Sequence, residues 1–276
     1  MSWFNLLRHD LRCGLLRPRY IIAALLALIP CLELLYGLSL TEYTGTWMDY
    51  MLNAFKGTAP VDKMDLTTPI QLPFLWFAIV GVCLFLNLDY MLYDLSNNGQ
   101  QVIIRTGKKQ GWFLSKCVWN LAGTVGYFAM IALVVWLFVV LTGGTPSLNN
   151  TPEVSLRTFI MVTWNRVELM PMEGVLVGLI SPCLAVAALS MLEMVLCLIV
   201  KPVISFLFCM ALLVLSVYWN SPMDLGNGAM AMRSALVVDG GHDPAVTIGI
   251  AISVIVICVV VGTVVFKHSD ILTKED

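Results

Sequence analysis

The sequence predicts an all-α integral membrane protein with six transmembrane helices. Of its 276 residues, 59% are hydrophobic and only 12% are charged, and the mean hydropathy is +0.85. About a quarter of an ordinary globular chain is charged, so this chain has too little polar surface for a soluble domain of its size. The apolar runs do not show the alternation of β-barrel strands, as residues 131–141 (IALVVWLFVVL) illustrate. The excess apolar surface must therefore face lipid, and the spans must be helices.

Six apolar segments are long enough to cross a bilayer. A membrane helix needs about 20 apolar residues, because a rise of about 1.5 Å per residue must cover about 30 Å of hydrocarbon. The segments are approximately residues 20–40, 71–95, 117–142, 174–199, 203–219 and 245–266. The fifth is short, which suits a locally thinned bilayer or an end shielded by a partner. Pro30 and Pro182 predict kinks inside two spans, and the GxxxG pair Gly174 and Gly178 predicts a close helix approach or, alternatively, a dimer contact.

The segments outside the spans have characters of their own. Residues 2–15 predict an amphipathic helix on the inner leaflet, which serves either as an elbow helix bordering a partner or as a plain interfacial anchor. We expect an irregular outer loop at 41–70, a loop at 143–173 that rests on the outer interface, and a short or re-entrant helix at 220–244 that packs on protein. We expect no cleavable signal, because the first apolar segment is too long and no A-x-A site follows it.

The distribution of Lys and Arg predicts the orientation. If both termini lie on one side, that side carries eleven of the sixteen cations and the opposite side carries five. The positive-inside rule then places both termini in the cytoplasm of a multi-pass protein of the cell (cytoplasmic) membrane. None of the eight cysteines falls in the outer loops, so we expect no outer disulfide framework.

Several kinds of chemistry are not expected. A phosphate-binding loop ending in Gly107 and Lys108 would need a glycine at Val102 and a hydroxyl residue at Lys109. The three histidines lie outside the spans without a paired metal-ligand spacing. We therefore expect no catalytic residue, no metal and no cofactor in this chain, and no nucleic-acid partner.

Three carboxylates fall within the predicted spans, namely Glu33, Asp89 and Glu193. An ionised group in a span is costly and normally faces a cavity or a partner. Asp89 and Asp94 lie at the inner end of the second span, where they can pair with Lys or Arg, and Glu193 has Lys201 nearby. Glu33 is the best placed to line a route through the membrane. An alternative function follows, a secondary transporter or channel that uses these carboxylates as proton or cation sites.

The connector at residues 96–116 is a polar, basic stretch between two apolar spans. Its sequence predicts a short helix near Val102 and Arg105, a break at Gly107, and a basic entry to the next span. Such a helix, apolar on one side and cationic on the other, suits docking into a groove of a soluble partner. A loop that binds lipid headgroups is the plainer alternative, and a membrane scaffold or sensor whose loop binds a regulator is a third.

A family resemblance rests on this connector. The residues are Asp94-x4-Gly99-x5-Arg105, then Lys108 and Lys109, Trp112, and Ser115 with Lys116 at the mouth of the next span. Together with the N-terminal amphipathic helix, the six spans and the embedded element before the last span, the pattern resembles permeases of the ABC-2-type exporter superfamily. The proline often found after the coupling helix of that family is absent, and Thr106-Gly107 stands there instead.

The resemblance implies a function for the connector. It would be the cytoplasmic coupling helix that docks a separate ATPase subunit, which binds ATP and Mg, through Gly99, Gln100, Gln101, Val102, Ile103, Ile104 and Arg105. Asp94, Lys108, Lys109 and Lys116 would support that coupling. The chain would pair with a second permease subunit, identical or related, to export a peptide, an antibiotic or a lipid, and immunity to an antimicrobial peptide is one family-level possibility.

Overall fold

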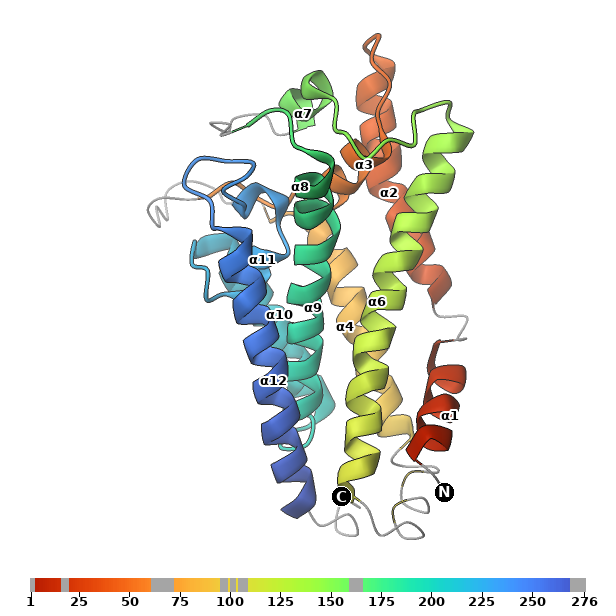
Figure 1. Ribbon diagram of the computed structural model, residues 1–276, viewed down its shortest axis with the longest axis vertical. Coiled ribbons are helices and arrows are strands. Elements are labelled where there is room, and N and C mark those ends of the chain that lie inside the picture. Colours follow the sequence, from red (N-terminus) through yellow and green to blue (C-terminus); the bar gives the residue numbers. More distant parts are fainter. Residues whose placement is uncertain are drawn as a thin grey trace.

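The computed structural model is a bundle of long helices that run roughly side by side (Figure 1). It describes residues 3–15, 20–60, 72–94, 99, 103, 109–158 and 166–268. The long helices are α2 (Tyr20–Ser39), α4 (Phe74–Asp94), α6 (Lys109–Leu141), α9 (Ser181–Leu196), α10 (Pro202–Tyr218) and α12 (Pro244–His268). The shorter elements are α1 (Trp3–Leu15), α3 (Trp47–Ala54), α7 (Pro152–Thr158), α8 (Pro171–Val175), the π-helical η2 (Leu176–Ile180), α11 (Leu225–Gly228) and the 3-10 turn η3 (Ala231–Arg233).

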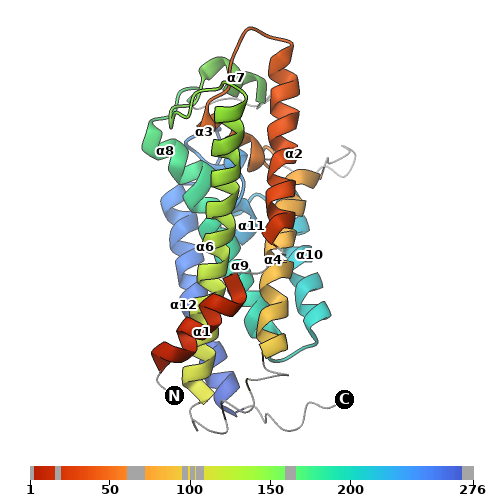
Figure 2. The same ribbon diagram turned by 90° about the vertical axis from the view of Figure 1, so that its right-hand side faces the viewer.

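The bundle has two distinct ends. One end carries α1, the last turn of α4, the first turns of α6 and the end of α12, and we call it the basal end (Figure 2). The opposite, apical end carries α3, α7 and α8 (Figure 1). Helix α1 lies obliquely across the basal part of α6 rather than continuing the line of α2 (Figure 2).

Membrane character is clear from four helical stretches, Ile21–Ser39, Lys109–Leu141, Pro171–Leu196 and Pro244–His268, which are long and apolar enough to cross a bilayer. Two shorter apolar helical stretches, Phe74–Leu88 and Pro202–Tyr218, lie beside them. The protein is therefore an all-helical membrane protein over its described residues. Helix α6 begins at Lys109, well before the predicted span at 117, so part of the expected connector at 96–116 is helical.

Helix α9 lies at the centre of the bundle. In the most apolar window of Pro171–Leu196, 61% of the residues are buried, against 17% for α12, which faces outward along most of its length. Pro182 follows the π-helical turn η2, in which the Ser181 N–H donates to the Leu176 carbonyl five residues earlier. A π turn of this kind accommodates the backbone bond that a proline removes. Where the sequence predicts a kink at Pro182, the structure has a widened turn.

The GxxxG glycines face α3 of the same chain. A Cβ on Gly174 would lie 3.0 Å from Met48 Sδ, and a Cβ on Gly178 would lie 3.4 Å from Leu52 Cδ2. Helix α3 is itself fixed by a capping box, in which Asp49 Oδ2 accepts from the Thr46 N–H at 2.9 Å. The close approach predicted for these glycines is therefore an intramolecular contact.

Residues 219–243, which we call the apical cap, pack on protein as the sequence predicts. The N–H groups of Ala231 and Met232 donate to the carbonyls of Phe55 (2.8 Å) and Lys56 (3.0 Å). Arg233 is 1% exposed, and its Nη2 donates to the Val217 carbonyl at 2.9 Å. Its cation is therefore held inside the cap and not on its surface.

The cap should respond to pH through Asp224. Burial raises the pKa of Asp224 from 3.8 to about 6, although the Gly226 N–H and Arg233 oppose the shift. A carboxyl with a raised pKa in the folded state contributes stability that is present below pH 3.8 and is lost as pH rises through about 6. Intrinsic amide hydrogen exchange rises with pH, so the measured rates are first divided by the intrinsic rates. We expect the corrected exchange rates of the cap to rise with pH across this window. The rise should be smaller in Asp224→Asn.

The comparison of Asp224→Asn with the parent protein is needed because His242 acts in the opposite sense. Burial and Arg233 lower the pKa of His242, so its charging destabilises the cap as pH falls. The difference between the two proteins isolates Asp224, and identical protection at every pH would contradict the assignment.

Candidate functional site

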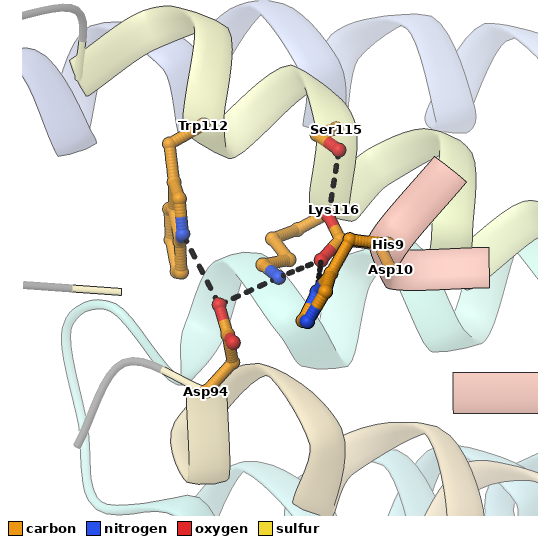
Figure 3. A network of polar contacts seen from close by, with 6 residues as sticks. All are labelled: His9, Asp10, Asp94, Trp112, Ser115 and Lys116. Carbon is orange, nitrogen blue, oxygen red and sulfur yellow. Dashed lines mark hydrogen bonds and ion pairs between the residues drawn. The ribbon is translucent and has the colours of Figure 1, made fainter. Parts of the chain in front are cut away.

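A buried lysine joins three elements at the basal end of the bundle. Lys116 of α6 is 0% exposed, and its Nζ lies 2.7 Å from Asp10 Oδ1 of α1 and 2.7 Å from Asp94 Oδ2 at the end of α4. Figure 3 shows the ammonium between the two carboxylates. One cation thus links the N-terminal helix to the helices on both sides of the connector.

Neighbouring side chains complete the hydrogen bonding of both carboxylates. Ser115 Oγ donates to Asp10 Oδ2 at 2.6 Å, and Trp112 Nε1 donates to Asp94 Oδ2 at 3.2 Å. Lys116 Nζ also lies 5.0 Å from the centre of the Trp112 ring, a cation–π distance. Trp112, Ser115 and Lys116 have the i, i+3, i+4 spacing that places them on one face of a helix. We call these three residues with Asp10 and Asp94 the basal ion cluster.

His9 lies at the edge of this cluster. Its Nδ1 is 4.0 Å from Asp10 Oδ1, and its side chain is 48% exposed whereas that of Asp10 is fully buried. Figure 3 shows the imidazole beside the Asp10 carboxylate. A protonated His9 would therefore add a second cation to the cluster from its solvent-facing side.

The basal ion cluster holds three helices together through buried charges. Moving ions out of water costs several kcal/mol each, and only close pairing with further hydrogen bonds offsets that cost. Each carboxylate here has the ammonium and one more donor, so the arrangement is satisfied when α1, α4 and α6 keep these positions. The described residues contain no group of three metal-ligating side chains.

The connector begins and ends at this cluster. Asp94 ends α4 and Trp112 lies in the first turn of α6, and both side chains contact Lys116. A Cβ on Gly99 would lie 3.0 Å from the Asp94 carbonyl and 3.1 Å from Trp112 Cζ2, so glycine permits the chain to pass this close. Ile103 is 4% exposed and belongs to a buried apolar cluster with Trp112 and Phe113.

These positions test the sequence predictions only in part. Asp94 does pair with a lysine at the basal end, as expected, and Lys116 is that lysine. Ile103, expected on the docking face, is instead buried against the chain's own helices. Lys109 opens α6 at a partly exposed position. The remaining residues proposed for docking or coupling lie outside the described part of the chain, namely Gln100, Gln101, Val102, Ile104, Arg105 and Lys108.

Asp10 is the member of the cluster that sequence reasoning missed. The helical pattern of α1 assigns Asp10 to the polar face with Arg8 and His9, yet the structure buries Asp10 completely while leaving Arg8 exposed. The charge pattern could have indicated this pairing. Asp10 is the single acidic residue in a cationic helix, and Lys116 lies near the start of α6. A carboxylate pointing at that lysine explains why α1 crosses α6.

The carboxylates of the predicted spans have different surroundings. Glu33 is 48% exposed and pairs with Lys56 at 3.1 Å, beside a pocket of about 220 Å³ that also borders Trp76. Asp89 belongs to α4, but its side chain is outside the described set. Glu193 is 1% exposed, and neither of its carboxylate oxygens has a hydrogen-bond partner within the described residues. The expected pairing of Glu193 with Lys201 is wrong, because Lys201 is exposed at the start of α10.

Comparison with known proteins adds no family assignment. No family model, no curated protein and no solved structure matches this chain.

Proposed function

We propose that the chain is the permease subunit of an ATP-binding cassette exporter, with ATP hydrolysis in separate subunits. The observation that carries the proposal is the basal ion cluster, which ties both ends of the basic connector to two apolar helices and to α1. A partner that pushed on this connector would move α1, α4 and α6 together, because separating them would expose buried ions. Rigid-body motion of packed elements is one of the recognised ways in which proteins switch between two arrangements.

The proposal includes six spans. Helix α4 has 21 residues and α10 has 17, which correspond to about 31 and 26 Å at about 1.5 Å per residue. The shorter helix needs only modest bilayer thinning. With the basal end in the cytoplasm, the connector and the four cations Arg105, Lys108, Lys109 and Lys116 lie on the side where ATP is available.

Two such bundles would enclose the pathway, and two ATPase subunits carrying ATP and Mg would dock on their connectors. Closure of the ATPases would favour one bundle arrangement and opening the other, so nucleotide state would shift the population between them. The cargo belongs to the broad class of peptides, antibiotics and lipids, which matches a chain whose bulk lies in the membrane.

The decisive experiment is purification of the tagged protein from its native membrane in mild detergent, followed by mass spectrometry. We expect a soluble ATPase with a phosphate-binding loop to accompany the wild-type chain. Reversing the charge of the connector with Arg105→Glu, Lys108→Glu and Lys109→Glu should reduce the recovery of the ATPase at least tenfold. Lys267→Glu, at the exposed end of α12, is the matched control and should leave recovery unchanged.

Deletion of residues 99–105 should likewise abolish ATPase recovery, and insertion into the membrane measures whether the shortened chain still folds. Labelling of single cysteines at Gln100 and Lys108 tests the sidedness, since reaction with an impermeant reagent on intact cells would overturn the proposal. Full ATPase recovery with the charge-reversed connector would also overturn it. Gradient-driven transport without an ATPase would favour a secondary transporter instead.

A further inference from the structure

Glu193 is a buried carboxylate in the most enclosed helix of the bundle. Its side chain is 1% exposed, and neither oxygen accepts a hydrogen bond from any residue that the structure describes. Its backbone carbonyl is already occupied, because it accepts from Ser205 Oγ at 2.7 Å and from the Cys197 N–H at 3.0 Å. The unmet hydrogen-bonding capacity therefore belongs to the carboxyl group alone.

Polar side chains of α4, α6 and α9 meet next to this group. Asn87 Nδ2 donates to Thr124 Oγ1 at 2.9 Å and to Ser190 Oγ at 3.0 Å. Asn120 Nδ2 lies 3.4 Å from the Ser190 carbonyl, which places its amide against the turn of α9 that contains Glu193. Asn120 Oδ1 is also buried and has no donor among the described groups. Both carboxylate oxygens of Glu193 and the Asn120 amide oxygen thus have no donor among the described groups.

Among the described residues, the titratable groups that interact with Glu193 are thiols. Cys83 of α4 and Cys209 of α10 are close enough to interact with it electrostatically. Cys258 of α12 is buried against the same stretch of α9, and α6 contributes the neutral Asn120 and Thr124. Within the described parts of these helices, no cation compensates a negative charge on Glu193.

An ionised carboxylate without a partner is among the costliest groups to bury, whereas its protonated form is neutral and gains an O–H donor. A proton on Glu193 thus removes the cost of a buried charge. We propose that Glu193 is an intramembrane proton-binding site, occupied when α4, α6, α9 and α10 are packed as in this structure.

The site lies close to the basal end of its helix. Helix α9 ends at Leu196, three residues beyond Glu193, so the carboxyl group lies within about 5 Å, along the helix axis, of the basal end of α9. When the helices part there and water enters, the O–H bond breaks heterolytically, the electron pair stays on the carboxylate, and the proton passes to water. Packing of the helices expels the water and favours proton uptake again. Proton exchange is thus linked to the same change of arrangement that a transport cycle requires.

Infrared spectroscopy of the purified protein in lipid nanodiscs at neutral pH tests the proposal directly. A protonated carboxylic acid has a C=O stretch that is separate from amide and carboxylate bands and shifts in D₂O. We expect the wild-type protein to show such a band. In Glu193→Gln, the band should lose the intensity that corresponds to one protonated carboxyl group. Glu33→Gln, which removes an exposed carboxylate paired with Lys56, is the matched control and should retain the band. An unchanged band in Glu193→Gln would overturn the proposal.

Thermal unfolding at several pH values provides a second readout. Ionisation of Glu193 would oppose helix packing, so the wild-type melting temperature should fall as pH rises above neutral, and Glu193→Gln should be less sensitive to pH. If Glu193→Gln folds and its melting temperature depends on pH as strongly as that of the wild-type protein, the proton site is contradicted. Neither measurement involves an ATPase, so its failure is distinguishable from failure of the proposed exporter function.

Discussion

Lys116→Met is expected to destabilise the protein by about 3–5 kcal/mol, the usual cost of removing one partner of a buried ion pair. The methionine fills much of the lysine's space but leaves Asp10 and Asp94 buried without a cation. The two carboxylates must then become protonated, hydrated or separated, and each outcome loosens α1 and α4 from α6. Reversible unfolding in mixed detergent, followed by intrinsic tryptophan fluorescence, measures the change, with Trp112 reporting from inside the cluster.

Two further variants separate charge from packing in this prediction. Lys267→Met changes an exposed lysine at the end of α12 and should have no effect. The triple variant Asp10→Asn, Asp94→Asn, Lys116→Met removes all three charges, and it should recover most of the lost stability because replacing a whole buried ion group is often close to neutral. If the free energy of unfolding of Lys116→Met equals that of the wild-type protein, the cluster does not hold these helices together.

Gly262→Val is the second change with a large expected effect. Gly262 lies where α12 meets α6 and α9, and a Cβ there would collide with the Phe113 ring and lie 2.9 Å from Val195 Cγ2. The Phe113 ring is itself stacked on Phe266, with centroids 5.8 Å apart, so it has little freedom to move away. Overpacking a well-filled site costs about 1–3 kcal/mol, occasionally more. We expect the upper part of that range, observed as a lower melting temperature and faster hydrogen exchange in the basal half of α12.

Gly249 provides the matched control within the same helix. A Cβ on Gly249 would meet nothing within 4 Å, so Gly249→Val makes the same chemical change without a collision. Comparable losses in the two variants would show that the effect comes from valine in α12 and not from the contact with Phe113.

The membrane helices could be predicted because one physical cause, the need of apolar segments to avoid water, determines where they lie in the sequence. Each apolar run must meet lipid or another helix, and the four long candidates fall within the predicted segments or close to them. The start of α6 was harder, because residues 109–116 are polar enough to resemble a loop. Their polarity instead serves the basal ion cluster, since Ser115 and Lys116 point at Asp10.

The site could be predicted only where partners are close in the sequence. Asp94 and Lys116 flank one connector, so their pairing was foreseeable, whereas Asp10 lies more than 100 residues from Ser115. Proximity along the chain was also misleading for Glu193. Lys201 is eight residues away, but the chain turns between α9 and α10 and leaves Lys201 at the surface. Contacts between distant segments depend on how the helices cross, which hydropathy alone does not determine.

The intramolecular contact of Gly174 and Gly178 with Met48 and Leu52 has a consequence for any assembly of two copies. Small-residue stripes are the usual surface for homotypic pairing in lipid, and here α3 already covers that stripe. Two protomers would therefore have to associate through faces of the bundle other than the one that carries this glycine pair.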